Sequence, residues 1–223
     1  MSRDHARQNL VRQNILATLR AGLAKAPFSP PEPPARPASL PIGPDAWELL
    51  AAKLAPLDVR LRLAKTPTEA AAHVADIARE RQAATYTRWD ELPASPELDS
   101  ALAGLTRVAP DCCQALAHVD LGLTYAHAAL LDSGSLVLVA GPGCARAVSL
   151  LPPTHICLVE RSALAPDVSA LPELLRCHAD TNGRLPSCLN LVTGPSSTAD
   201  IELVPVRGVH GPGALELVAL DWD

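Results

Sequence analysis

The sequence predicts an α/β protein with three layers, in which helices flank a mainly parallel sheet. From residue 45 onwards, strand-like and helix-like segments alternate, and this alternation favours parallel strands with helices on the faces of the sheet. Hydrophobic residues make up 48% of the 223 residues, which is enough for a sizeable core. The continuous apolar run at 136–140 is typical of a strand that is buried on both faces.

The chain is expected to begin with a helical arm at residues 1–26. Its helix spans 2–24 and carries an apolar stripe at helical spacing, formed by Leu10, Val11, Ile15, Leu16, Leu19 and Leu23. Residues 27–44 contain eight prolines, and proline lacks the amide donor that helix interiors and central strands require. We therefore expect an extended linker there and a main domain over residues 45–223. The arm packs either on its own domain or on a partner.

The first half of the main domain predicts a helix followed by the order β-α-β-α. The expected elements are a helix at 45–55, a strand at 59–63, a helix that opens at 66–67, a strand at 83–87 and a helix at 97–104. Thr66-Pro67-Thr68-Glu69 has the form of a capping box with proline at the first helical position. The apolar residues of that helix continue to Ala78.

The second half is richer in strands and turns. The expected elements are a strand at 136–140, a strand at 155–159, a helix at 167–177, a strand at 188–193 and a strand at 214–220. Asp132-Ser133-Gly134-Ser135 is expected to form a turn that Asp132 caps. His155 opens its strand and is expected to be a structural, hydrogen-bonded histidine.

Charge and composition exclude several functions. Nineteen Lys and Arg against 24 Asp and Glu give a net charge of −5, which provides no global attraction to nucleic acid or to an anionic membrane. Three Trp, two Tyr and one Phe are too few for a platform that stacks bases. No apolar run reaches the roughly 18 to 20 residues that span a bilayer, and arginines interrupt the N-terminal apolar stretches. We expect a cytoplasmic protein with no membrane span.

The six cysteines do not predict a metal site. No CxxC pair occurs, and the adjacent Cys112 and Cys113 suit neither a zinc knuckle nor an iron–sulfur loop. Cys157 and Cys188 lie in apolar, strand-like runs, where a free thiol behaves as a small hydrophobic group. We expect reduced, structural thiols, no metal ligands and no cofactor in this chain.

The most informative stretch is 191–202, where an apolar strand ends in a Gly194-Pro195 turn. The turn is followed by three hydroxyl residues and two acids, Ser196, Ser197, Thr198, Asp200 and Glu202. Backbone amides and hydroxyls in such a turn can bind a carboxylate or a phosphate, and α/β sheets bind ligands beyond the carboxyl ends of their strands. The acids suit recognition of a hydroxyl, a cation or proton transfer. Alternatively, Ser197 and Asp200 have the spacing of a helix cap.

A second bend, Gly208-Val209-His210-Gly211-Pro212-Gly213, places an imidazole among glycines. An accessible imidazole titrates near neutrality and suits a general base, a donor or a metal ligand, although it is also an ordinary turn residue. Arg146 either clamps a carboxylate or phosphate or forms a surface salt bridge. We predict that the two bends meet at one hollow that holds a small anion. The candidate catalytic residues are His210, Glu202 and Asp200, and the candidate ligand-binding residues are Gly194, Ser196, Ser197, Thr198, Arg146, Ser149 and Gly211.

The motifs together resemble those of one protein family. The segments that carry the resemblance are Gly122-Leu123-Thr124, Asp132–Ser135, Arg146–Pro153 with His155-Ile156, Gly194–Glu202 and Gly208–Pro212. They resemble the lactate-utilisation protein C group of LUD-domain proteins over roughly residues 119–220. Each segment alone is weak, and the combination is fairly specific. Walker, GxGxxG, HExxH and GxSxG motifs are absent from the sequence.

The resemblance implies a fold like that of sugar-phosphate isomerases and CoA-transferases. It also implies a non-redox subunit in the oxidation of L-lactate to pyruvate, beside partner subunits that carry iron–sulfur clusters. It supplies no established catalytic residue, so whether this chain turns over a substrate stays open. Two alternatives remain: a stand-alone enzyme that acts on a phosphorylated or CoA-linked small molecule, and a pure assembly protein.

Overall fold

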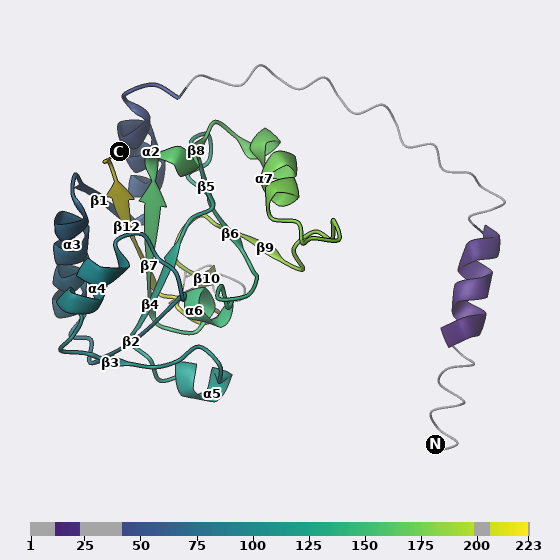
Figure 1. The fold of residues 1–223 in the computed structure, drawn as a ribbon, viewed down its shortest axis with the longest axis horizontal. Coiled ribbons are helices and arrows are strands. Elements are labelled where there is room, and N and C mark those ends of the chain that lie inside the picture. The colour runs from purple at the N-terminus through teal and green to yellow at the C-terminus, as the bar shows by residue number, and fades with distance from the viewer. Residues whose placement is uncertain (1–11, 23–41, 199–205, 223) are drawn as a thin grey trace. The chain divides into compact units, whose positions relative to one another are not determined.

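The computed structural model describes residues 12–22, 42–198 and 206–222 and divides into two units (Figure 1). The first unit, Met1–Pro37, contains a helix at 12–22, so this part of the predicted arm is helical. The remainder of the arm and most of the proline-rich linker lie outside the described residues. The second unit, Ala38–Asp223, holds the α/β domain.

A parallel sheet forms the centre of the second unit. Its strands, in spatial order, are β1 (Arg60–Ala64), β12 (Ala214–Leu220), β7 (Thr154–Glu160), β4 (Leu121–Tyr125), β2 (Thr85–Arg88) and β3 (Thr106–Arg107). Each neighbouring pair in this sheet is parallel. The expected mainly parallel α/β class is therefore confirmed. The strand predicted at 214–220 has the predicted ends, whereas the central strand β4 was not predicted.

A second, mixed sheet contains the strand that leads into the hydroxyl-rich stretch at 194–198. Its spatial order is β8 (Leu164–Ala165), β5 (Ala128–Leu130), β6 (Leu136–Val139) and β9 (Leu189–Val192). β6 runs antiparallel to both β5 and β9, and β5 runs parallel to β8. The strands predicted at 136–140 and 188–193 exist, but they belong to this sheet. A two-stranded ribbon, β10 (Ser197–Thr198) with β11 (Val206–Arg207), completes the strands.

Helices complete the layers around the parallel sheet. They are α2 (Ala46–Leu54), α3 (Pro67–Glu80), α4 (Ser95–Ala101), α5 (Cys113–Leu116), α6 (Ala147–Leu150) and α7 (Leu171–Cys177), with 3-10 turns at Ala55–Leu57, Arg161–Ala163 and Val168–Ala170. Figure 1 shows α3 and α4 on one side of the parallel sheet, and the second sheet with α7 on the other. The three-layer arrangement agrees with the sequence prediction.

The start of α3 confirms the predicted capping box. The Thr66 hydroxyl accepts a hydrogen bond from the Glu69 backbone N–H at 3.1 Å, while the Glu69 carboxylate accepts from the Lys65 N–H at 2.7 Å. The return bond therefore reaches one residue earlier than in the usual motif. The ends of α4 are shifted from the predicted range of 97–104. The helix begins two residues earlier, at Ser95, because Pro96 suits the first helical turn, and it ends three residues earlier, at Ala101.

The backbones of β4 and α6 approach each other closely. A Cβ added to Gly122 would lie 1.9 Å from the Val148 carbonyl oxygen. A side chain cannot fit in that space, so glycine is required for α6 to lie on β4. This contact also positions Ser149 and Leu150, which follow Val148 in the helix.

The buried Glu216 forms a two-arginine ion pair in β12. Its Oε1 accepts from Arg60 Nη2 and from Arg81 Nη2, both at 2.6 Å, and its Oε2 accepts from Arg60 Nε at 3.1 Å. The Glu216 side chain is 2% exposed, while the two arginines are partly exposed. These bonds connect β12 to β1 and to the end of α3.

A Glu216→Gln substitution is expected to lower the free energy of unfolding by about 2 kcal/mol, because it removes a buried charge that two guanidinium groups share. The arginines keep access to water, which limits the loss. Urea unfolding measures the effect. Glu80→Gln is the matched control, because the Glu80 carboxylate binds Arg60 and Arg62 at an exposed position and should change little. Equal losses for the two variants would contradict the assigned role of Glu216.

Candidate functional site

The structure brings the two predicted bends into contact, as expected. The first bend is the hydroxyl-rich stretch at 194–198, and the second is the histidine-containing stretch at 208–213. The Ser196 backbone N–H donates to the Pro212 carbonyl at 2.8 Å, and the Gly208 N–H donates to the Ser196 carbonyl at 2.9 Å. Ser197 also pairs with Arg207 in the β10–β11 ribbon. Ser196 is thus held on both sides by the histidine-containing bend.

The bends lie at the edge of the parallel sheet where its strands begin (the amino edge). We expected them at the opposite edge, where the strands end (the carboxyl edge). β9 runs antiparallel to β6 in the mixed sheet, so the rule that places ligands beyond parallel strands does not apply to its end. The second bend leads directly into β12, where the Ala214 N–H donates to the Pro153 carbonyl. Figure 1 shows β10 and α6 near the ends at which β7 and β12 begin.

Gly211 allows close packing inside this contact. A Cβ at that position would lie 3.2 Å from Ser196 Cβ and 4.0 Å from the Leu150 carbonyl oxygen. A larger residue would push the bend away from both Ser196 and the end of α6. Gly208 has a φ of +81°, which L side chains rarely adopt. The glycines therefore shape the second bend.

The polar groups of the bends differ in exposure. Ser197 and His210 are exposed, whereas Ser196 and Thr198 are half-buried. Ser197 and Thr198 are both in β10, so the alternative in which Ser197 caps a helix is wrong. The predicted acids Asp200 and Glu202 lie outside the described residues.

The structure adds Arg207 to this surface. Arg207 lies opposite Ser197 in the ribbon, and its Nη1 donates to Asp58 Oδ2 at 2.7 Å, with both side chains exposed. Directly opposed residues of an antiparallel pair share one face, so Arg207 and Ser197 lie on the same face of the ribbon, and a guanidinium there suits an anion. Sequence reasoning missed Arg207, although a cation directly before the glycine bend was a usable signal.

Arg146 and Ser149 are not placed at the bends by any described side-chain contact. The Ser149 hydroxyl is buried and donates to the Arg146 carbonyl at 3.0 Å, within the turn of α6. Arg146 Nη1 donates to Cys188 Sγ at 3.6 Å. Cys188 precedes β9, so this guanidinium lies at the opposite end of β9 from Gly194.

Two further predictions have clear outcomes. His155 is a buried structural histidine as expected, with Nε2 hydrogen-bonded to Thr124 Oγ1 at 2.8 Å, and burial lowers its pKa to about 4. The turn before β6 is capped by Ser133, whose hydroxyl accepts from the Ser135 N–H, and not by Asp132. Ser135 in turn shares a 2.8 Å hydrogen bond with Thr193, at the base of the first bend.

A cleft of about 640 Å³ lies where β4 ends, and sequence reasoning did not identify it. Its walls come from three distant parts of the chain and include Tyr125, His127, Cys144, His178, Asp180 and Arg184. Tyr125 is the last residue of β4, so this cleft lies at the carboxyl end of a parallel strand, where α/β folds bind ligands. The available signal was the pair of ring residues Tyr125 and His127, at and just beyond the end of β4.

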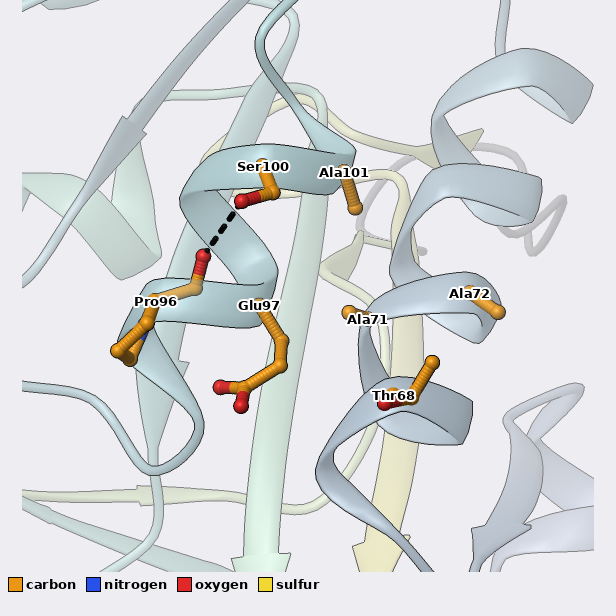
Figure 2. A pocket seen from close by; sticks show the side chains of 7 residues that line it. All are labelled: Thr68, Ala71, Ala72, Pro96, Glu97, Ser100 and Ala101. Carbon is orange, nitrogen blue, oxygen red and sulfur yellow. Dashed lines mark hydrogen bonds between the residues drawn. The ribbon is translucent and has the colours of Figure 1, made fainter.

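Another cavity lies between α3 and α4 (Figure 2). Small side chains line it, and its polar groups are Thr68, Glu97 and Ser100. The Ser100 hydroxyl donates to the Pro96 carbonyl at 3.0 Å, so it is occupied within its own helix. The groove offers no group of reactive side chains. Among the described residues, no cluster of three or more His, Cys, Asp or Glu could hold a metal ion.

Comparison with known proteins gives a consistent family match. The LUD domain matches residues 48–220. Lactate utilization protein C of Halalkalibacterium halodurans is 46% identical over 95 residues, and that of Bacillus subtilis is 40% identical over 95 residues. The Escherichia coli protein YkgG, described as uncharacterized, is 43% identical over 95 residues. Each alignment covers 43% of this chain and 40–41% of the relative, so the chain matches about two fifths of their length.

A solved structure supports the fold. A DUF162 family protein from Deinococcus radiodurans superposes with a TM-score of 0.61 at 20% identity, covering 79% of this chain and 96% of that one. At this identity the likeness concerns the fold alone. No helix within the described ranges is both long and apolar enough to cross a membrane.

Proposed function

Because this chain belongs to the LUD domain family, we propose that it is a non-redox subunit of a lactate-utilisation system that oxidises L-lactate to pyruvate. The names of the curated relatives support this role. In this proposal the iron–sulfur chemistry belongs to partner subunits. The sequence spacing of the six cysteines is consistent with that division of work, since it contains no CxxC pair.

The subunit binds a small carboxylate where the two bends meet. The observation that carries this proposal is the pair of backbone bonds that hold Ser196 against the second bend. Beside these bonds, Ser197 and His210 are exposed to an incoming molecule, and Arg207 is paired only with the exposed Asp58 among the described residues. A carboxylate can accept from the hydroxyl and compete with Asp58 for the guanidinium.

The same surface suits a protein partner. Leu191, Val206 and Val209 are each at least half exposed, and all three lie in or beside the two bends. Apolar side chains that gather on a surface are typical of a protein contact. An iron–sulfur subunit that covers them would also enclose the carboxylate.

Ser197→Ala and His210→Ala are each expected to weaken binding of L-lactate or pyruvate by about tenfold, the loss for one hydrogen bond to a charged group. Isothermal titration calorimetry measures the affinity, and growth on lactate of a deletion strain that carries each variant measures the role. Ser162→Ala and His118→Ala are matched controls, because both residues are exposed and lie outside the bends. Unchanged affinity in both test variants would contradict the carboxylate site.

The outcomes also separate the alternative functions. Normal growth of both bend variants, together with loss of growth when residues 1–26 are deleted, would assign a pure assembly role. Tight binding of CoA or a phosphorylated metabolite by the purified chain, without binding of lactate or pyruvate, would assign the stand-alone enzyme.

A further inference from the structure

The cleft at the end of β4 has a wall of aromatic rings in tilted and edge-to-face contact. The Tyr125 and His127 ring centroids are 4.6 Å apart at 38°, and the His127 and His178 centroids are 4.7 Å apart at 76°. Trp89 supports this wall from behind, with its ring edge-on to Tyr125 at 5.2 Å. Rings held in this way present π surface to a planar molecule.

The hydrogen-bonding groups in the wall are held in their neutral, donating forms. His127 Nδ1 accepts from the Val139 N–H at 3.2 Å, so the proton of the neutral ring is on Nε2. Burial, aided by His178, lowers the pKa of His127 to about 4. Burial first, and the neighbouring Cys144 next, raise the pKa of the Tyr125 phenol, and burial raises the pKa of the Cys144 thiol. Each of these three groups therefore keeps a proton to donate.

One guanidinium at the cleft, that of Arg184, can pair with an anion, although, in addition to burial, the carboxylates of Glu91 and Glu160 lie close enough to raise the pKa of Tyr125. Among the described residues that line the cleft, Arg184 is the one Lys or Arg and Asp180 is the one carboxylate. Asp180 Oδ1 already accepts from the backbone N–H groups of Asn182 and Arg184. Arg184 is exposed, with no ion pair to any described residue.

We propose that this cleft is a second ligand site, separate from the bends, which binds a planar aromatic carboxylate. The ring of the ligand stacks on one of the two imidazoles, His127 or His178, and meets the other edge-on, because their planes are 76° apart; its carboxylate pairs with the Arg184 guanidinium, and the neutral donors contact its polar edge. The volume of about 640 Å³ is in the range of small-molecule sites in proteins. The site shares no residue with the bends, so it does not depend on the lactate proposal.

Three matched probes test which features are recognised. The compounds 2-naphthoate, decahydro-2-naphthoate and 2-naphthamide differ in the aromatic ring or in the charge and have nearly the same size. Ligand-observed NMR on the full chain is expected to give an affinity for 2-naphthoate at least tenfold higher than for the other two. Equal affinity for the saturated acid would overturn the role of the rings, equal affinity for the amide would overturn the role of the charge, and no binding by any probe at millimolar concentration would overturn the site.

Variants locate the binding. Arg184→Ala and His178→Ala are each expected to weaken 2-naphthoate binding by about tenfold while leaving the thermal midpoint unchanged, because both side chains are exposed. Arg176→Ala and His118→Ala are matched controls, since Arg176 is exposed on α7 and pairs with Glu173 outside the cleft. Losses as large in the controls would contradict the proposal. His210→Ala is expected to leave 2-naphthoate binding unchanged, because His210 lies in the second bend and not in the cleft. The two proposals therefore fail independently: loss of the carboxylate site at the bends does not affect binding in the cleft.

Discussion

A Gly122→Ala variant is expected to lose about 3 kcal/mol or more of the free energy of unfolding, the upper range for overpacking a core. The added methyl would collide with the Val148 carbonyl oxygen at 1.9 Å and meet the Val148 carbonyl carbon at 3.0 Å. Both partners are backbone atoms, so no side-chain rotation relieves the collision, and α6 must leave β4. Urea denaturation followed by circular dichroism measures the loss.

The control for this variant is Gly104→Ala. A Cβ at Gly104 would meet no atom within 4 Å, so the substitution should leave stability unchanged or raise it slightly by restricting the unfolded chain. Displacement of α6 also predicts weaker ligand binding at the bends, because the Leu150 carbonyl oxygen would lie only 4.0 Å from a Cβ added to Gly211. Full stability in Gly122→Ala would show that the β4–α6 contact is less close than described.

Stability is expected to fall as the pH is lowered from 7, with His155 as a main cause. Burial lowers the pKa of His155 from 6.5 to about 4, so between these values the unfolded chain binds a proton that the folded chain does not. Proton linkage at this residue therefore lowers the free energy of unfolding as the pH falls. The decrease is about 2 kcal/mol from pH 7 to pH 5 and about 3 kcal/mol from pH 7 to pH 4. The lowered pKa of His127 acts in the same direction, with less weight because that ring is only half-buried.

A His155→Gln variant isolates this contribution. Glutamine can still hydrogen-bond to Thr124 and does not titrate, so the stability difference between the natural chain and the variant should shrink as the pH falls from 7 to 4. Carboxylates whose pKa is lowered, such as Asp120 and Asp221, lose their contribution near and below their usual range in both proteins and cancel. Chemical denaturation at several pH values measures the difference. A difference that stays constant with pH would contradict a neutral His155 in the fold.

The predicted parts of the fold rest on interactions between near neighbours in the sequence. The capping box at Thr66 and Glu69 was recognisable because its partners lie within four residues. The strand at 214–220 was recognisable because every one of its residues except Glu216 is apolar. The missed central strand β4 contains Gly122, a residue that weakens strand propensity. Its glycine serves a contact with Val148, 26 positions later, which no local pattern reveals.

The candidate site shows the same division. Residue chemistry identified the hydroxyls and the imidazole of the bends, and backbone hydrogen bonds join the two bends. The edge of the sheet at which they lie was predicted wrongly, because the direction of β9 depends on its pairing with β6. Arg146 was a candidate ligand-binding residue, and its side chain donates to Cys188, 42 residues away, at the end of β9 far from Gly194.

The sequence by itself determined the α/β class, most of the helices and strands, and the two polar bends, since periodicity, proline and capping act over a few residues. Only the tertiary structure decided that β9 joins a separate mixed sheet, that the bends lie at the amino edge, and that Tyr125, His127 and His178 form one wall. Strand pairing and ring contacts join residues that are tens of positions apart. Their energies depend on how the whole chain packs, so a local pattern does not encode them.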